Sequence, residues 1–69
     1  MLNVSPYARE RMHELHISEE MVRIAFHEPD TMRELLTLSP LASYRRRYPG
    51  FMLRVLIDGE RVVSVSTHP

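Results

Sequence analysis

Apolar and polar residues recur with two different periods along this chain, and the period changes after the first thirty residues. In the first part, Ala8, Met12 and Leu15 recur at the i, i+4 and i+7 spacing of one helical face. Ser5 is a suitable N-cap for this helix, and Pro6 suits its first position. The pattern therefore predicts a helix that begins at Ser5 and ends at Leu15.

A second helix is predicted from Ser18 to the residue before Pro29. Ser18 can accept the capping hydrogen bond, and the next two residues are glutamates, which the helix dipole favours in the first turn. The apolar residues of this segment cover a wide arc, which predicts a central position in the fold: Met21, Val22, Ile24, Ala25 and Phe26. Pro29 ends the helix because the residue before a proline avoids the helical region.

The rest of the chain shows the two-residue period of β-strands. Strands are predicted over residues 31–38, 43–48, 51–57 and 61–67, with a loop at 39–43. Residues 31–38 also suit a short helix, and the strand is preferred because apolar and polar residues alternate there. Within residues 43–48 the alternation places Tyr44, Arg46 and Tyr48 on one face and Arg45 and Arg47 on the other.

The last two predicted strands form a hairpin whose register follows from their apolar residues. Pairing Phe51, Leu53 and Val55 with Val63, Val65 and Thr67 on one face requires odd residues to face odd residues. That parity predicts a three-residue loop, Asp58-Gly59-Glu60. Arg54 would then share the opposite face with Val62, Ser64, Ser66 and His68.

Together these elements predict one α+β domain over residues 1–69, with two N-terminal helices packed on a three- to four-stranded antiparallel sheet. The 69-residue chain has no cysteine, so disulfides cannot support it. A core of this size rarely contributes more than about 3–5 kcal/mol, so a partner or a second copy forming a homodimer is expected. No apolar run approaches the roughly 20 residues of a membrane span, and no leader pattern is present. A cytoplasmic protein without a membrane partner is expected.

Charge is distributed unevenly along a chain whose net charge is zero. All nine basic residues are arginines, and nine acids balance them. Residues 1–34 hold seven acids and four arginines, whereas residues 35–57 hold four arginines and no acid. This asymmetry indicates either an anion-binding face or two halves of one domain that attract each other.

The sequence does not indicate several common kinds of site. His13 and His16 lie three residues apart on a helix, but no cysteine and no third ligand accompanies them, so no metal or other cofactor is expected. No serine is flanked by the glycines of a nucleophile elbow. Gly50 and Gly59 alone cannot form a glycine-rich phosphate loop.

RNA chemistry is the function class that the basic middle of the chain suits. RNA cleavage without a metal needs a base for the 2′-hydroxyl, cations for the phosphate and an acid for the leaving oxygen. Arginine binds phosphate bidentately, and tyrosine rings stack on unpaired bases. The candidates for RNA or anion binding are Tyr44, Arg45, Arg46, Arg47 and Tyr48. The alternative is a solvated sheet face whose arginines discourage edge-to-edge pairing.

Two stretches carry a resemblance to a known family. "YARERM" at 7–12 and "ISEEMVRIAFHEPD" at 17–30 resemble the DUF4258 family of small bacterial proteins. "RRRY", "FMLRVLID" and "RVVSVSTHP" then follow in the order of that family's strands. The family is similar to the RelE/barnase-like toxins. The resemblance therefore implies a RelE-like ααββββ arrangement and a ribonuclease of the kind found in toxin–antitoxin pairs.

The resemblance also implies catalytic roles for single residues. Tyr7 takes the place of the family's first-helix histidine and is, with His68, an acid/base candidate. Arg11 matches the helix arginine and is expected to turn toward the sheet, unless it pairs with a nearby acid. Arg54 matches the strand arginine and is expected to bind phosphate together with Arg46.

Two functions from different classes follow from these patterns. The first is a small toxin-type, metal-independent endoribonuclease, similar to mRNA interferases, whose basic sheet is masked by an acidic antitoxin-like protein. The second is a non-catalytic interaction module of the same fold, encoded by a phage or mobile element, which docks on a host or partner protein. A DNA-binding regulator is disfavoured because such domains are usually basic overall.

Overall fold

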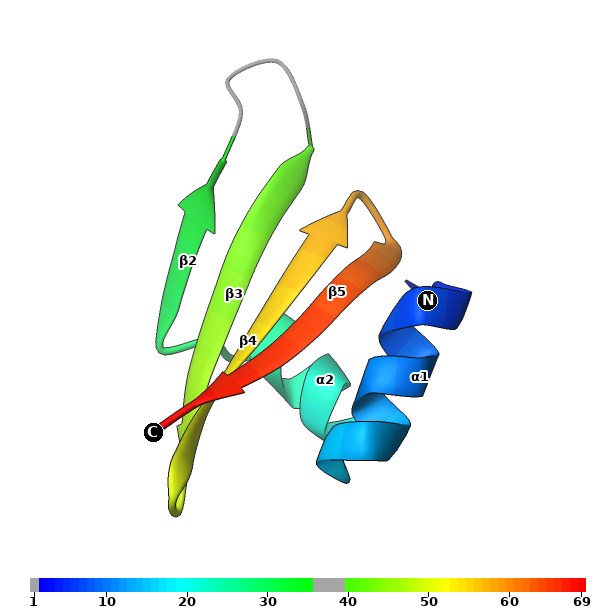
Figure 1. The fold of residues 1–69 in the computed structure, drawn as a ribbon. Helices are drawn as coiled ribbons and strands as arrows, with labels where there is room; N and C mark the ends of the chain where they lie inside the picture. The colour runs from blue at the N-terminus through cyan, green and yellow to red at the C-terminus, as the bar shows by residue number, and fades with distance from the viewer. Residues whose placement is uncertain (1, 36–39) are drawn as a thin grey trace.

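A computed structural model describes residues 2–35 and 40–69 of the chain. It contains helices α1 (Pro6–Leu15) and α2 (Glu19–His27) and strands β1 (Asn3–Val4), β2 (Thr31–Glu34), β3 (Leu41–Tyr48), β4 (Phe51–Asp58) and β5 (Arg61–His68). The strands form one mixed sheet in the order β1-β5-β4-β3-β2, and both helices cover the same face of it (Figure 1). The predicted α+β class and the two N-terminal helices are confirmed. Neither helix is long and apolar enough to cross a membrane within the described ranges.

Both helices begin at the serines that the sequence indicates. The Oγ of Ser5 accepts a hydrogen bond from the Ala8 N–H, and the Oγ of Ser18 accepts one from the Met21 N–H, each at 3.1 Å. His16 ends α1 in the left-handed conformation, with φ of 58°. The chain then enters α2 within two residues, so the two helices lie next to each other on the sheet.

The first strand, β1, is not among the predicted elements, and it makes the sheet mixed rather than antiparallel. It runs parallel to β5, with the Asn3 N–H donating to the Glu60 carbonyl at 2.7 Å and the Ser5 N–H donating to the Val62 carbonyl at 3.0 Å. Two residues are too few to show an alternating pattern, which explains why periodicity does not reveal this strand. With β1 in place, β5 is an inner strand and not an edge.

The boundaries of the next two strands differ from the prediction. β2 ends at Glu34, and the predicted strand residues 36–38 lie outside the described residues. The predicted loop at 39–43 is wrong from Leu41 onward, because β3 begins there. Leu41, Ala42 and Ser43 pair with the last three residues of β4, and these cross-strand bonds extend β3 beyond its alternating segment.

The β4–β5 hairpin has a two-residue turn, Gly59–Glu60, so the predicted three-residue loop is wrong. Asp58 pairs with Arg61, and Gly59 takes the positive φ, 67°, that a tight hairpin turn requires. A β-bulge between Leu56 and Ile57 then shifts the register. On the turn side of this bulge the two-residue turn pairs Val62 with Ile57, so Val62 lies in the core and not on the face of Arg54 as predicted.

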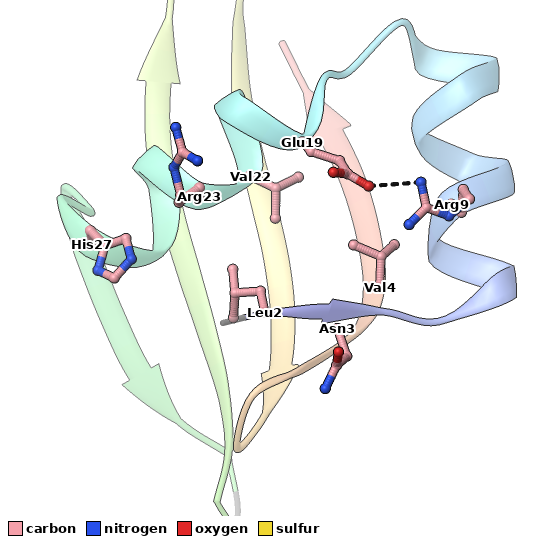
Figure 2. Close-up of a pocket in the computed structure, with 8 residues that line it drawn as sticks. All are labelled: Leu2, Asn3, Val4, Arg9, Glu19, Val22, Arg23 and His27. Carbon is pink, nitrogen blue, oxygen red and sulfur yellow. Dashed lines mark ion pairs between the residues drawn. The ribbon is translucent and has the colours of Figure 1, made fainter.

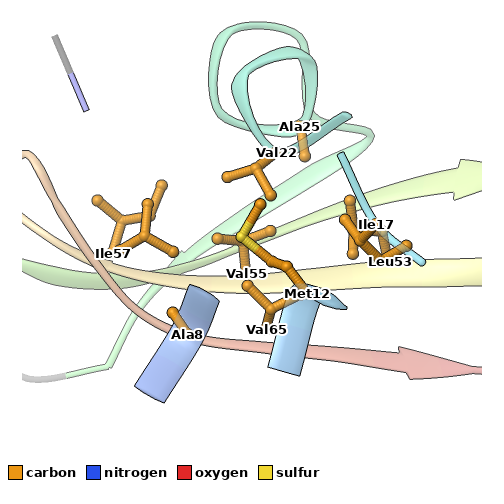
Figure 3. Packing of buried hydrophobic residues seen from close by; sticks show 10 residues of the cluster. Ala8, Met12, Ile17, Val22, Ala25, Leu53, Val55, Ile57 and Val65 are labelled. Carbon is orange, nitrogen blue, oxygen red and sulfur yellow. The ribbon is translucent and has the colours of Figure 1, made fainter. Parts of the chain in front are cut away.

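The core lies between the helices and one face of the sheet (Figure 3). Leu53, Val55 and Ile57 of β4 are fully buried there, which confirms the predicted inward face of this strand. Val22 and Ala25 of α2 meet them from the helical side, together with Ala8 and Met12 of α1. The other face of the sheet, which carries Arg54, has no described helix on it, and we call it the open face.

Candidate nucleic-acid interface

The three consecutive arginines are divided between the two faces of β3, as strand alternation predicts. Arg46 is opposite Leu53 and therefore points toward the helices, whereas Arg45 is opposite Arg54 on the open face. Arg47, two residues beyond Arg45, shares the open face. The expectation that Arg46 and Arg54 together bind one phosphate is wrong, because the sheet separates them.

The row of Tyr44, Arg46 and Tyr48 docks helix α2 on the sheet. The Tyr48 hydroxyl donates to the Met21 carbonyl at 3.1 Å, and the Tyr44 ring meets Phe26 edge-on, with centroids 5.0 Å apart. Arg46 donates to the carbonyl of Glu28, the residue that caps the C-terminal end of α2. These three predicted RNA-binding side chains therefore contact the protein's own helix, and their local role is structural.

Replacing Arg46 by methionine is expected to lower the free energy of unfolding by about 1 kcal/mol and to leave anion binding unchanged. The arginine complements the negative end of the α2 dipole, a contribution of about this size. Part of its loss is offset because the Nε of Arg46 is buried without a hydrogen-bond partner among the described residues. Urea unfolding and RNA titration of the same variant check both statements. An RNA affinity reduced as much as by loss of Arg54 would contradict the structural role.

Three neighbouring strands place a basic cluster on the open face, which consists of Arg45, Arg47, Arg54 and His68. Met52 lies between Arg47 and His68 in one row across the sheet, and Arg45 faces Arg54 in the next. Paired residues are about 5 Å apart, and successive rows about 7 Å apart. With Met52 and Pro69, the cluster lines a shallow concavity of about 300 Å³. The prediction that Arg54 and His68 share a face is confirmed by this register.

Arg45 and Arg54 are placed directly opposite each other, an arrangement that costs stability when nothing neutralises it. Their guanidinium groups have no carboxylate partner among the ion pairs of the described residues. The Nε of Arg54 donates to the Oγ of Ser43 at 3.1 Å, and Ser43 is only 3% exposed. This bond orients the guanidinium and leaves its two terminal nitrogens available to a ligand.

Most acids of the first half of the chain lie on or next to the helices, whereas Glu34 lies on β2 and the Asp30 carboxylate accepts a hydrogen bond from the Arg47 N–H at 2.6 Å. The pair Arg9–Glu19, at 2.7 Å, joins α1 to α2, and Arg23 pairs with Glu20 within α2. Within the described ranges, ion pairs stay in the helical layer and do not link it to the arginines of the sheet. Asp58 is the carboxylate at an open-face strand position, opposite Arg61. The charge asymmetry therefore lies mainly between the helices and the arginines of the sheet, which favours the anion-binding interpretation.

Tyr7 and Arg11 are not brought to the basic cluster. Both lie on α1, which packs on the opposite face of the sheet, against β5. Tyr7 is 60% exposed, and the Arg11 guanidinium lies 3.9 Å from the Glu14 carboxylate. The resemblance implies catalytic roles for both residues, but the fold supplies neither to a ligand held by Arg54 and His68.

A larger concavity, of about 580 Å³, lies between the two helices and β1 (Figure 2). Leu2, Val4 and Val22 form its apolar floor. The charged groups around it already form pairs, since Arg9 bridges to Glu19 across it and Arg23 is held by Glu20. The smaller concavity on the open face is the better candidate site, because its cations have no such partners among the described residues.

The donor groups of the basic cluster suit an anion. Arginine offers only N–H donors, and several of them in one concavity match the oxygens of a phosphate. Within the described ranges, which include this cluster, no group of three or more histidine, aspartate, glutamate or cysteine side chains is placed to hold a metal ion. The cluster is therefore a candidate for binding phosphate groups. Strand parity could have placed Arg33 on the open face, although the sequence interpretation did not name it. The predicted parity would have put Arg61 on the core face, and Arg61 reaches the open face because the two-residue turn pairs it with Asp58.

The resemblance of residues 7–30 to the DUF4258 family rests on the residues quoted above and stays a prediction. No family model, no curated protein and no solved structure matches this chain.

Proposed function

We propose that the protein binds RNA through the basic cluster of the open face and cleaves it there in a toxin-type reaction. The observation that carries this proposal is the direct opposition of Arg45 and Arg54. Two like charges at paired positions weaken a sheet by themselves, and a phosphate between them converts that repulsion into two attractive contacts. The Ser43 hydrogen bond, which orients Arg54 in advance, also supports this proposal.

His68 is the proton-transferring residue of the cluster. It lies one strand over and one row beyond Arg54, at the same concavity. Its imidazole takes the proton of the ribose 2′-hydroxyl, the 2′-oxygen bonds to phosphorus, and the bond from phosphorus to the 5′-oxygen breaks. The arginines stabilise the negative charge that builds up on the phosphate oxygens. The departing 5′-oxygen receives a proton from the imidazolium or from water, leaving a 2′,3′-cyclic phosphate and a 5′-hydroxyl.

A second candidate function, a non-catalytic module that binds a polyanion, is favoured by one specific observation. Among the described residues lining the concavity, His68 is the one side chain that readily exchanges protons, since arginine stays charged. Cleavage by two separate acid/base residues would also have needed Tyr7, which α1 holds at the other face. A module of this kind binds RNA, or an acidic partner protein, without cutting it.

Replacing Arg54 by glutamine tests the binding that both functions share. The change keeps a polar side chain that can still meet Ser43, and it removes one charge-assisted contact to phosphate. We expect the affinity for single-stranded RNA to fall about tenfold at moderate salt. Arg61→Gln is the matched control, because Arg61 is also an open-face arginine but lies opposite Asp58, away from the cluster. Fluorescence anisotropy with a labelled RNA oligonucleotide measures both variants.

The outcomes separate the proposed functions. Weaker binding by the Arg54 variant alone, with cleavage products from the wild-type protein, supports the ribonuclease. Weaker binding without cleavage over a range of pH supports the non-catalytic module. Equal affinities for the wild type and the Arg54 variant would overturn RNA binding at this cluster.

A further inference from the structure

The cations of the open face continue beyond the basic cluster onto the edge strand β2. Arg33 of β2 is opposite Ser43, and Ser43 bonds Arg54, so Arg33 lies on the same face. Thr31, the other β2 residue of that face, is opposite Arg45. Arg33 is exposed and takes part in no ion pair among those of the described residues. A further cation is therefore available one strand beyond Arg45.

These residues form a line that crosses the sheet obliquely, which we call the cationic diagonal: the arginines Arg54, Arg45 and Arg33, with the proton acceptor His68 at one end. Each step moves one strand over, and two of the three steps also move one row along. With strands about 4.8 Å apart and rows about 7 Å apart, the diagonal is about 20 Å long. Its cations are arranged in single file rather than around one point, so a compact anion can contact only some of them.

On the basis of the proposed function, we propose that the ligand is an extended single-stranded nucleic acid lying along the cationic diagonal, with Arg33 as an additional phosphate contact. The row spacing is comparable to the step between phosphates of a stretched single strand, so when one phosphate lies between Arg45 and Arg54, its neighbours lie near Arg33 on one side and His68 on the other. A single strand can adapt to a flat face over this length. A rigid duplex curves away from it after a few phosphates.

The surface beside the diagonal also suits unpaired nucleotides. Met52 and Leu56 of β4 are half-buried open-face side chains on either side of Arg54 in its strand. They offer apolar surface on which the faces of unpaired bases can rest, next to the arginines that hold the phosphates. A duplex keeps its base faces stacked inside and gains nothing from these contacts.

The test uses DNA oligonucleotides of two and of eight thymidines, which lack the 2′-hydroxyl and therefore are not cleaved. Binding to the full chain is measured by fluorescence anisotropy between 50 and 200 mM salt, for the wild type and for Arg33→Gln, Arg54→Gln and Arg61→Gln. Each lost phosphate contact should reduce the slope of log affinity against log salt by about 0.7. We expect Arg33→Gln to reduce this slope by that amount for the eight-mer and to leave the slope for the two-mer unchanged. Arg54→Gln should weaken both, and Arg61→Gln neither.

The failure of this inference differs from the failure of the proposed function. An eight-mer slope unchanged by Arg33→Gln, with Arg54→Gln still effective, would show that the site ends at Arg45 and would overturn the diagonal alone. Unchanged binding by Arg54→Gln would overturn the proposed function itself. Two outcomes would overturn the choice of a single strand as ligand. One is tighter binding of an eight-base-pair duplex than of the single-stranded eight-mer. The other is displacement of the bound eight-mer by an equal concentration of an eight-residue glutamate peptide.

Discussion

Replacing His68 by glutamine is expected to slow RNA cleavage by about 100- to 10,000-fold while leaving RNA affinity within about twofold of the wild type. Positioned proton transfer contributes rate factors of this order. Glutamine is polar and of similar reach, but it cannot accept the 2′-hydroxyl proton. Because the arginines that bind phosphate stay in place, the loss should be confined to the chemical step. Single-turnover cleavage with protein in excess, together with anisotropy on a non-cleavable strand, measures the two quantities separately.

The same two quantities, cleavage rate and RNA affinity, are measured for a control variant. Arg61→Gln, at the far end of the open face, should change neither cleavage nor binding, because Arg61 lies outside the cluster. Cleavage that persists in the His68 variant and disappears with Arg54→Gln would assign proton transfer to another group. Equal loss of binding and cleavage in the His68 variant would instead make His68 a binding residue.

Strand alternation was sufficient to divide the basic segment, but not to decide which part of it is available to a ligand. Both faces of β3 carry arginines, so the polarity of its residues does not distinguish the face that packs on the helices from the open face. The decision comes from α2, whose Phe26 and Met21 carbonyl meet Tyr44 and Tyr48. Arg46, the favoured candidate from sequence, is thereby used to cap a helix, and Arg45 takes its place beside Arg54.

The register of the last hairpin shows a second limit of pattern reading. Parity correctly put Val55 and Val65 on the same face of the sheet, but the predicted three-residue loop would have paired Val55 with Val63, and Val65 is its partner instead. The parity argument assigned the extra residue to the loop, because a change of parity can be absorbed either in a turn or in a bulge. The chain uses a bulge beside Leu56, which allows Gly59 to form a two-residue turn and carries Val62 into the core. His68 and Arg54 still share a face because both lie beyond the bulge on the same side.

The residue roles implied by the family resemblance were the hardest to predict from the sequence, because they depend on where tertiary packing places each helix. Tyr7 and Arg11 were placed in a catalytic group by the family pattern, whereas helix packing directs α1 to the covered face of the sheet. The strand residues Arg54 and His68 were placed by alternation, which is a local property of the chain. Local periodicity therefore predicted the open-face part of the site, and contacts between distant segments determined the rest.

Replacing Leu53 by alanine is expected to leave the protein largely unfolded at 25 °C. Leu53 lies in the middle of the central strand β4, is fully buried, and is among the largest of the fully buried side chains. Removing a buried leucine side chain to the β-carbon costs about 2–5 kcal/mol, because the cavity left behind collapses only in part. A core in a domain of this size contributes about 3–5 kcal/mol in total. The loss is therefore comparable to the whole stability.

Leu56→Ala is the matched control for this prediction, since it makes the same change three residues along the same strand but on the open face. Leu56 is only half-buried, and no described helix packs on it, so its loss should leave no enclosed cavity. Circular dichroism should show a folded Leu56 variant with cooperative urea unfolding, and a Leu53 variant that has lost most of its strand signal. Similar midpoints for the two variants would mean that a second copy or partner covers the open face in solution, because only then would Leu56 be as enclosed as Leu53. In that case the Leu56 midpoint should rise with protein concentration, since association stabilises the folded state by mass action.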